Sequence, residues 1–183
     1  MYTLKSFIKE SASDRNAAVF ENNPLHVQMR LADSDDPEVR RILAMNVSTL
    51  PSVLSKLAND TSLEVRKALA GHQNTPPEVL HNLASDPNPE IRRCLAFNKS
   101  APGSVLAAWA DADESDTDTR QALAQNPNTP EQILIALSRD HDPWIRQCLA
   151  ENPSLPIEAL RTLAEDDDES VRWTAQGELS QRE

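Results

Sequence analysis

The sequence predicts an all-α fold, a right-handed superhelical solenoid of about six 26-residue repeats, each a longer α-helix plus a short α- or 3-10 helix. Two observations predict it. A unit written most cleanly at residues 65–90 recurs along nearly the whole chain. Each copy carries two runs of apolar residues at helical spacing. The scarcity of aromatic residues, 4% of 183, fits short helices packed through leucine and small side chains.

The repeat keeps its register over most of the chain. Successive copies open at steps of 26, 26, 28, 26 and 26 residues, at Val39, Val65, Ile91, Thr119, Ile145 and Val171. One unit of this size cannot bury its apolar face without neighbours. We therefore expect a single repeat domain over residues 1–183, with a capping helix in 1–13, repeats in 14–170 and a partial repeat or cap in 171–183.

The first helix of each copy carries its inward stripe at positions such as Val65, Ala68 and Leu69. An aspartate, often followed by proline, precedes it and is a good helix start. An asparagine such as Asn126 usually follows it, with His72 as the exception. Because asparagine tolerates the left-handed conformation, we expect it to end the helix.

The second helix of each copy follows a signal such as Thr75-Pro76, where the hydroxyl can accept a hydrogen bond from a free backbone N–H. Its stripe includes Val79, Leu80 and Leu83. We expect this helix to be the longer of the two and to end at an acidic turn. Helices this short persist only through packing.

These residues resemble the leucine-rich repeat variant (LRV) family. The shared pattern is V-R-x-x-L-A-x-N-P-x-T-P-x-x-x-L-x-x-L-A-x-D, seen at 119–140 and 145–166, and the resemblance covers about residues 14–172. It implies a superhelix of alternating α and 3-10-type helices in a mostly bacterial, functionally diverse group. Some members carry a cysteine-rich iron–sulfur module before the repeats, but this chain has no cysteine before Cys94, so we expect no cofactor. HEAT and armadillo repeats are the alternative fold, although their period of roughly 40 residues is too long.

The composition limits the function. A net charge of −11 argues against a general binder of nucleic-acid backbones and is compatible with a basic protein partner. Cys94 and Cys148 stand two copies apart, too far for a disulfide, which favours a reducing cytoplasm. The first residues contain no long apolar run, so we expect no signal peptide or membrane span. No glycine-rich phosphate loop, metal cluster or catalytic triad is recognisable, and we expect neither a metal nor an enzyme.

A column of arginines is the most persistent polar feature: Arg40, Arg66, Arg92, Arg120, Arg146 and Arg172. It could form a basic ridge that binds phosphate or carboxylate. It could instead be structural, with each guanidinium bonded to carbonyl groups or to the loop aspartate of a neighbouring copy. We favour the structural interpretation because acidic residues outnumber basic ones in most copies.

Residues that break their column are better functional candidates than residues present in every copy. The positions one before, two after and six after the opening residue share one outward helical face. Early copies carry charges there, whereas later copies carry Phe97, Trp144 and Trp173. The two tryptophans come from adjacent copies and could form one exposed patch, as interfaces often do. Alternatively, Trp173 covers the end of the stack and Trp144 folds onto its own loop.

The second candidate is an acidic edge formed by turns between the helices. Its residues are Asp111, Asp113, Glu114, Asp116, Glu165, Asp166, Asp167, Asp168 and Glu169. They could attract a basic partner or serve only as solvated turns. A calcium loop is a weaker interpretation, because the glycine and the final glutamate of such loops are missing.

The function we expect is a non-catalytic protein-interaction module or adaptor that recognises a protein through the aromatic face, the acidic edge or both. The alternative is a nucleic-acid-related protein. It would either mimic nucleic acid and block a basic protein, or bind phosphate through the arginine column.

Overall fold

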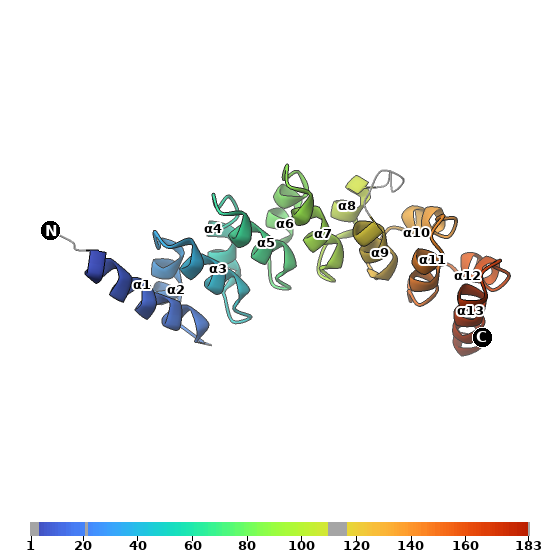
Figure 1. The fold of residues 1–183 in the computed structure, drawn as a ribbon, viewed down its shortest axis with the longest axis horizontal. Coiled ribbons are helices and arrows are strands. Elements are labelled where there is room, and N and C mark those ends of the chain that lie inside the picture. Colours follow the sequence, from blue (N-terminus) through green and yellow to red (C-terminus); the bar gives the residue numbers. More distant parts are fainter. Residues whose placement is uncertain (1–3, 21, 110–116, 183) are drawn as a thin grey trace. The chain divides into compact units, whose positions relative to one another are not determined.

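All regular secondary structure is helical in the part of the chain that the computed structural model describes, residues 4–20, 22–109 and 117–182 (Figure 1). The chain divides into two compact units, Met1–Cys94 and Leu95–Glu183, with the boundary inside α7. Up to that boundary the helices are α1 (Leu4–Val19), α2 (Leu25–Ala32), α3 (Pro37–Met45), α4 (Pro51–Lys56), α5 (Leu63–Gly71), α6 (Pro77–Ala84) and α7 (Pro89–Phe97). After it come α8 (Gly103–Leu106), the 3-10 helix η1 (Ala107–Trp109), α9 (Thr117–Gln125), α10 (Glu131–Leu137), α11 (Pro143–Ala150), α12 (Ile157–Leu163) and α13 (Glu169–Arg182).

Within each unit the helices alternate between two layers. In the first unit α3 packs against α1 and α5 in one layer, and α2 packs against α4 in the other. In the second unit α11 packs against both α9 and α13, while α12 packs against α11 and α13. Each described unit is therefore a stack of helix pairs, which confirms the predicted all-α repeat fold.

The core repeats with the sequence. Leu43 and Leu69 in the first unit are at most 1% exposed, and Leu123 and Leu149 in the second are fully buried. Both pairs are separated by one repeat, so each leucine fills the same place in successive layers. Burial of a leucine side chain contributes roughly 1.5–3 kcal/mol, and the same contribution recurs in every repeat.

The relative lengths of the two helices differ from the expectation. The helices that follow the Thr-Pro signals are not the longer ones, since α6 has 8 residues and α10 has 7, whereas α3, α5 and α9 each have 9. An aspartate cap sets the start of α3, whereas α5 reaches the same length with no side-chain cap. Asp36 accepts a hydrogen bond from the backbone N–H of Glu38, so α3 starts two residues before its first stripe position, Val39.

The threonines at the repeat junction also act differently from the expectation. The cap residue of α6 is Pro76, and no side chain caps this helix. Thr75 instead turns back: its hydroxyl donates to the carbonyl oxygen of Leu69 at 2.8 Å, near the end of α5. Thr49 and Thr129 make the equivalent bonds to Leu43 and Leu123. The threonines at this position therefore bond to a carbonyl group of the preceding helix and do not cap the start of the next one.

The asparagine column does not use the left-handed conformation. Asn46, which ends α3, has φ −73° and ψ 117°, an extended conformation. Its side-chain amide instead donates to the carbonyl oxygens of Ala18 and Phe20, one repeat earlier. The expectation was wrong because it considered only the backbone preference of asparagine and not the bonding capacity of its side-chain amide.

The same cross-repeat bonds recur in the second unit. Asn126 is 2% exposed; its Nδ2 donates to the carbonyl oxygens of Ala96 (2.7 Å) and Asn98 (3.0 Å), and its Oδ1 accepts from the N–H of Asn128. Asn152 repeats the pattern one copy later, bonding to Ala124 and Asn126. Among the described residues, every buried side-chain nitrogen and oxygen has a hydrogen-bond partner.

His72 occupies the asparagine column in the first unit and reproduces its bonds. Its Nδ1 accepts from the backbone N–H of Asn74, and its Nε2 lies 3.0 Å from the carbonyl oxygen of Asn46. Because Nδ1 is an acceptor here, Nε2 carries the hydrogen and donates to Asn46. His72 is thus a chemical substitute for the asparagine of this column.

We expect Asn126→Ala to lower the free energy of unfolding by about 2–3 kcal/mol, because it leaves buried carbonyl groups without their donor. His72→Asn should change it by less than about 1 kcal/mol, since asparagine can form the same bonds. Urea unfolding followed by circular dichroism measures both. A cost for Asn126→Ala no larger than that of His72→Asn would show that the column does not join the repeats.

Candidate functional site

The arginine column joins consecutive repeats in both units. Arg146 Nε and Nη2 donate to the two carboxylate oxygens of Asp166 at 2.7 and 2.8 Å, and its Nη1 donates to the carbonyl oxygen of Asp140 at 2.6 Å. Each guanidinium therefore ties the loop of its own repeat to the loop of the next. The equivalent pairs are Arg40–Asp60, Arg66–Asp86 and Arg120–Asp140.

Two arginines of the column have different surroundings. Arg172 Nη1 donates to the carbonyl oxygens of Asp166 and Asp167. The loop that would carry the partner of Arg92 falls within residues 110–116, outside the described residues.

The pairing changes the acidity of the loop carboxyl groups. Hydrogen bonds from Arg146 lower the pKa of Asp166 against the opposing effect of burial. At Asp60 and Asp86 burial acts to raise the pKa, and the bonds from the paired arginine and from a backbone N–H together outweigh it, so the pKa is lowered. These carboxylates stabilise the fold in their charged form.

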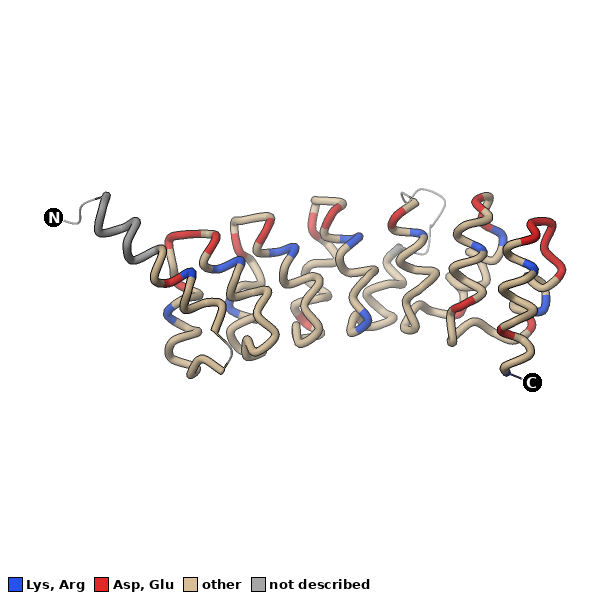
Figure 2. The backbone as a smooth tube through the Cα atoms, turned by 60° about the horizontal axis from the view of Figure 1, so that its bottom comes forward, with Lys and Arg blue, Asp and Glu red and all other residues tan. Residues whose placement is uncertain are grey.

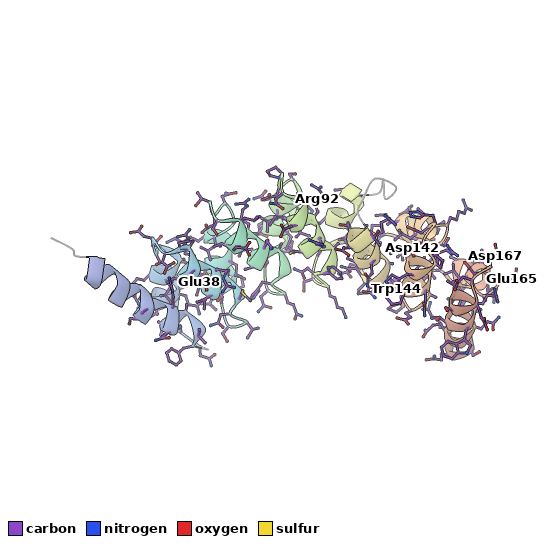
Figure 3. The ribbon with its side chains drawn as sticks, viewed as in Figure 1. Glu38, Arg92, Asp142, Trp144, Glu165 and Asp167 are labelled. Carbon is purple, nitrogen blue, oxygen red and sulfur yellow. The ribbon has the colours of Figure 1, made fainter. Side chains whose placement is uncertain are left out.

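The acidic edge contains both structural and free carboxylates. In Figure 2 acidic loops (red) lie beside basic residues (blue) within each unit. Asp166 is bonded to Arg146, and Asp168 accepts from the N–H groups of Ser170 and Val171 at the start of α13. Glu165 and Asp167 are exposed in the α12–α13 loop (Figure 3), and Glu169 is exposed at the start of α13. Asp111, Asp113, Glu114 and Asp116 lie outside the described residues.

The aromatic candidates are all exposed. Trp173 on α13 is 78% exposed, Trp144 at the start of α11 is 52% exposed, and Phe97 at the end of α7 is 50% exposed. Trp144 lies next to the aspartate that caps the start of α11, Asp142 (Figure 3). The carboxylate of Asp142 accepts a hydrogen bond from the backbone N–H of Trp144. Because α11 and α13 pack side by side, the two tryptophans belong to neighbouring helices of one layer.

A hollow of about 710 Å³ adjoins Trp173; we call it the Trp173 hollow. One side is formed by α11 and by the residue that follows this helix, and the other side is formed by α13. The lining residues are Gln147, Glu151, Trp173, Thr174, Gln176, Gly177, Glu178, Ser180 and Gln181. A second hollow of about 500 Å³ lies toward the start of α13 and also contacts Trp173. Trp144 lines neither of them. Trp173 is therefore the aromatic residue around which the surface is recessed.

The first unit has a comparable hollow of about 420 Å³ between α3 and α5. Arg41, Met45, Lys67 and Gly71 are among the residues that line it. Its cations are already paired: Arg41 lies 2.7 Å from Glu38, and Lys67 lies 2.6 Å from Glu90.

The Trp173 hollow and the hollow between α3 and α5 were not predicted, although the sequence contains a signal for both. Each opens at a glycine six residues after the opening residue of its repeat, Gly71 or Gly177. A Cβ added at either glycine would meet nothing within 4 Å. Other repeats place larger side chains at this position, such as Met45, Phe97 and Glu151.

The described residues show neither a membrane-spanning helix nor a metal site. No helix among them is both long and apolar enough to cross a bilayer. Nor do three or more histidine, cysteine, aspartate or glutamate side chains converge there to hold a metal ion.

No protein-family model and no curated protein matches the chain. Among solved structures, one described as a leucine-rich repeat variant with a novel repetitive structural motif is 22% identical, with a TM-score of 0.47, covering 98% of this chain and 88% of that one. A designed armadillo repeat protein is 18% identical, with a TM-score of 0.37, covering 98% and 94%. A computationally designed armadillo repeat protein for modular peptide recognition is 15% identical, with a TM-score of 0.39, covering 97% and 94%.

We expect Asp166→Asn to reduce the loss of stability on acidification. A carboxyl group whose pKa is lowered by folding stabilises the protein above its unfolded pKa, about 3.9, and loses that contribution as the pH falls through its folded pKa. Unfolding free energies measured from about pH 6 downward should therefore fall less steeply in Asp166→Asn than in the wild type. Asp167→Asn is the matched control, because this neighbouring carboxylate is exposed. Equal slopes in wild type and Asp166→Asn would contradict the stabilising role of the pair.

Proposed function

We propose that this chain is a non-catalytic interaction scaffold that binds a protein through the outward face of α11 and α13. The observation that carries the proposal is Trp173, a large aromatic side chain 78% exposed with a hollow on either side of it along α13. Exposed aromatic residues beside recessed surface are typical anchors of protein interfaces. Trp144 extends the same helical layer and supplies a second exposed aromatic group.

A basic partner is favoured by charge. The chain has a net charge of −11, and Glu165, Asp167 and Glu169 are exposed near the start of α13. Such a surface accelerates encounter with a positively charged protein and disfavours acidic ones. Asp166 and Asp168 contribute less to this attraction, since both carboxylates are bonded within the fold.

The arginine column is a poor candidate for binding nucleic-acid phosphates. In Arg40 and Arg146 the guanidinium groups already hold a carboxylate, and burial leaves their side chains only 14% and 15% exposed. A phosphate would have to displace Asp60 or Asp166 and break the bond between two repeats. We therefore do not assign nucleic-acid binding to this column.

The double substitution Trp144→Ala plus Trp173→Ala tests the proposal. Both side chains are exposed, so the melting temperature and helical content should change little. Recovery of a partner from native-cell extract on the immobilised full chain should fall about tenfold, as loss of one interface anchor worth about 1.4 kcal/mol or more would produce.

The matched control replaces two exposed apolar residues outside this face, Phe20→Ala plus Ile135→Ala. Its recovery of the same partner should equal that of the wild type. Equal recovery by the tryptophan variant and the wild type would refute the proposed face.

A further inference from the structure

The Trp173 hollow carries negative charge that no lining residue balances. Glu151 and Glu178 are the charged residues among those that line it. Glu178 lies 3.9 Å from Arg182, a long contact, and Arg182 donates to the carbonyl oxygens of Asn152 and Leu155 at 2.8 and 3.1 Å. The nearby guanidinium is therefore held mainly by backbone and leaves the carboxylate of Glu178 open to another cation.

Glu151 stands where a negative charge is least favourable. It is the C-cap residue of α11, at the negative end of the helix dipole, and its side chain is exposed. A cation bound there would interact favourably with both the carboxylate and the helix end. A cationic partner would relieve the repulsion between this carboxylate and the negative end of the helix.

Trp173 adds an uncharged group that also prefers cations. The face of an indole ring attracts ammonium and guanidinium groups, and tryptophan is the strongest of the aromatic side chains in this respect. Gly177, one turn further along α13, keeps the space beside Trp173 open. Gln147 and Gln181 supply amide oxygens that can accept hydrogen bonds from the same cation.

We propose that the Trp173 hollow binds a lysine or arginine side chain on a flexible basic segment of the protein partner, with the cation over the Trp173 indole and between Glu151 and Glu178. This assignment rests on the proposed function and deepens it. A hollow of about 710 Å³ exceeds the volume of one side chain, so residues flanking the cation also enter it. The α3–α5 hollow gives no such preference, because Arg41 and Lys67 are already paired with glutamates.

A labelled dodecapeptide of alternating glycine and lysine tests this assignment against an otherwise equal glycine–glutamate peptide. Fluorescence anisotropy with the full chain should show saturable binding of the lysine peptide and none of the glutamate peptide. Glu151→Gln plus Glu178→Gln preserves shape while removing two charges, and should weaken binding about tenfold or more. Trp173→Leu should weaken it severalfold through loss of the cation–π contact.

The control Glu131→Gln plus Glu158→Gln makes the same change of net charge at exposed sites on α10 and α12. It should weaken binding less than about twofold, because neither residue lines the Trp173 hollow and salt screens interactions between exposed charges that are not in contact. An equal loss in control and test variants would overturn the assignment, as would absence of lysine-peptide binding in the wild type. The assignment would also be overturned if free arginine competed with the peptide and bound as tightly as the peptide does. That result would indicate a site for small cations.

These outcomes are separable from failure of the proposed function. If the partner still depends on Trp144 and Trp173 but the lysine peptide does not bind, the interaction face stands and only its cation specificity falls. If partner recovery is independent of both tryptophans, the scaffold proposal falls even where the lysine peptide binds.

Discussion

The structure depends on hydrogen bonds that cross from one repeat to the next. Helices of 6 to 9 residues, such as α4 and α3, are too short to persist alone, and a single helix pair leaves its apolar face open. Stacked leucines cover that face, but hydrophobic contact alone is non-directional. The buried amide of Asn126 and the guanidinium of Arg146 supply directional bonds that fix how successive layers meet.

This constraint divides the residues of the chain into two groups. Polar residues that recur in most copies, such as Arg146 and Asn126, are already bonded within the fold and have little capacity for another ligand. Residues that differ from their column are not needed for this bonding between repeats. Trp173 and Gly177 replace other residue types on an outward face, and together they produce an exposed ring beside an open hollow. Binding chemistry is therefore concentrated where the repeat pattern is broken.

Sequence periodicity predicted the helix pairs and the buried stripe, since the positions of Leu69 and Leu123 follow directly from helical geometry. It did not predict the roles of Thr75 and Asn126, because their bonds depend on carbonyl groups six residues earlier or one repeat earlier. The exposure of Trp173 was one of two open alternatives. The hollow beside it depends on how the side chains of α11 and α13 face one another. The spacing of residues along the sequence does not specify this arrangement.

The most direct measurement is hydrogen–deuterium exchange of the full chain, alone and saturated with the partner that requires Trp144 and Trp173. Slower exchange on binding should be concentrated in α11 and α13, at the end of α11 and around Trp173. Protection confined to the loops that carry the arginine–aspartate pairs, residues 34–36, 60–62 and 140–142, would contradict the division between structural columns and a binding face.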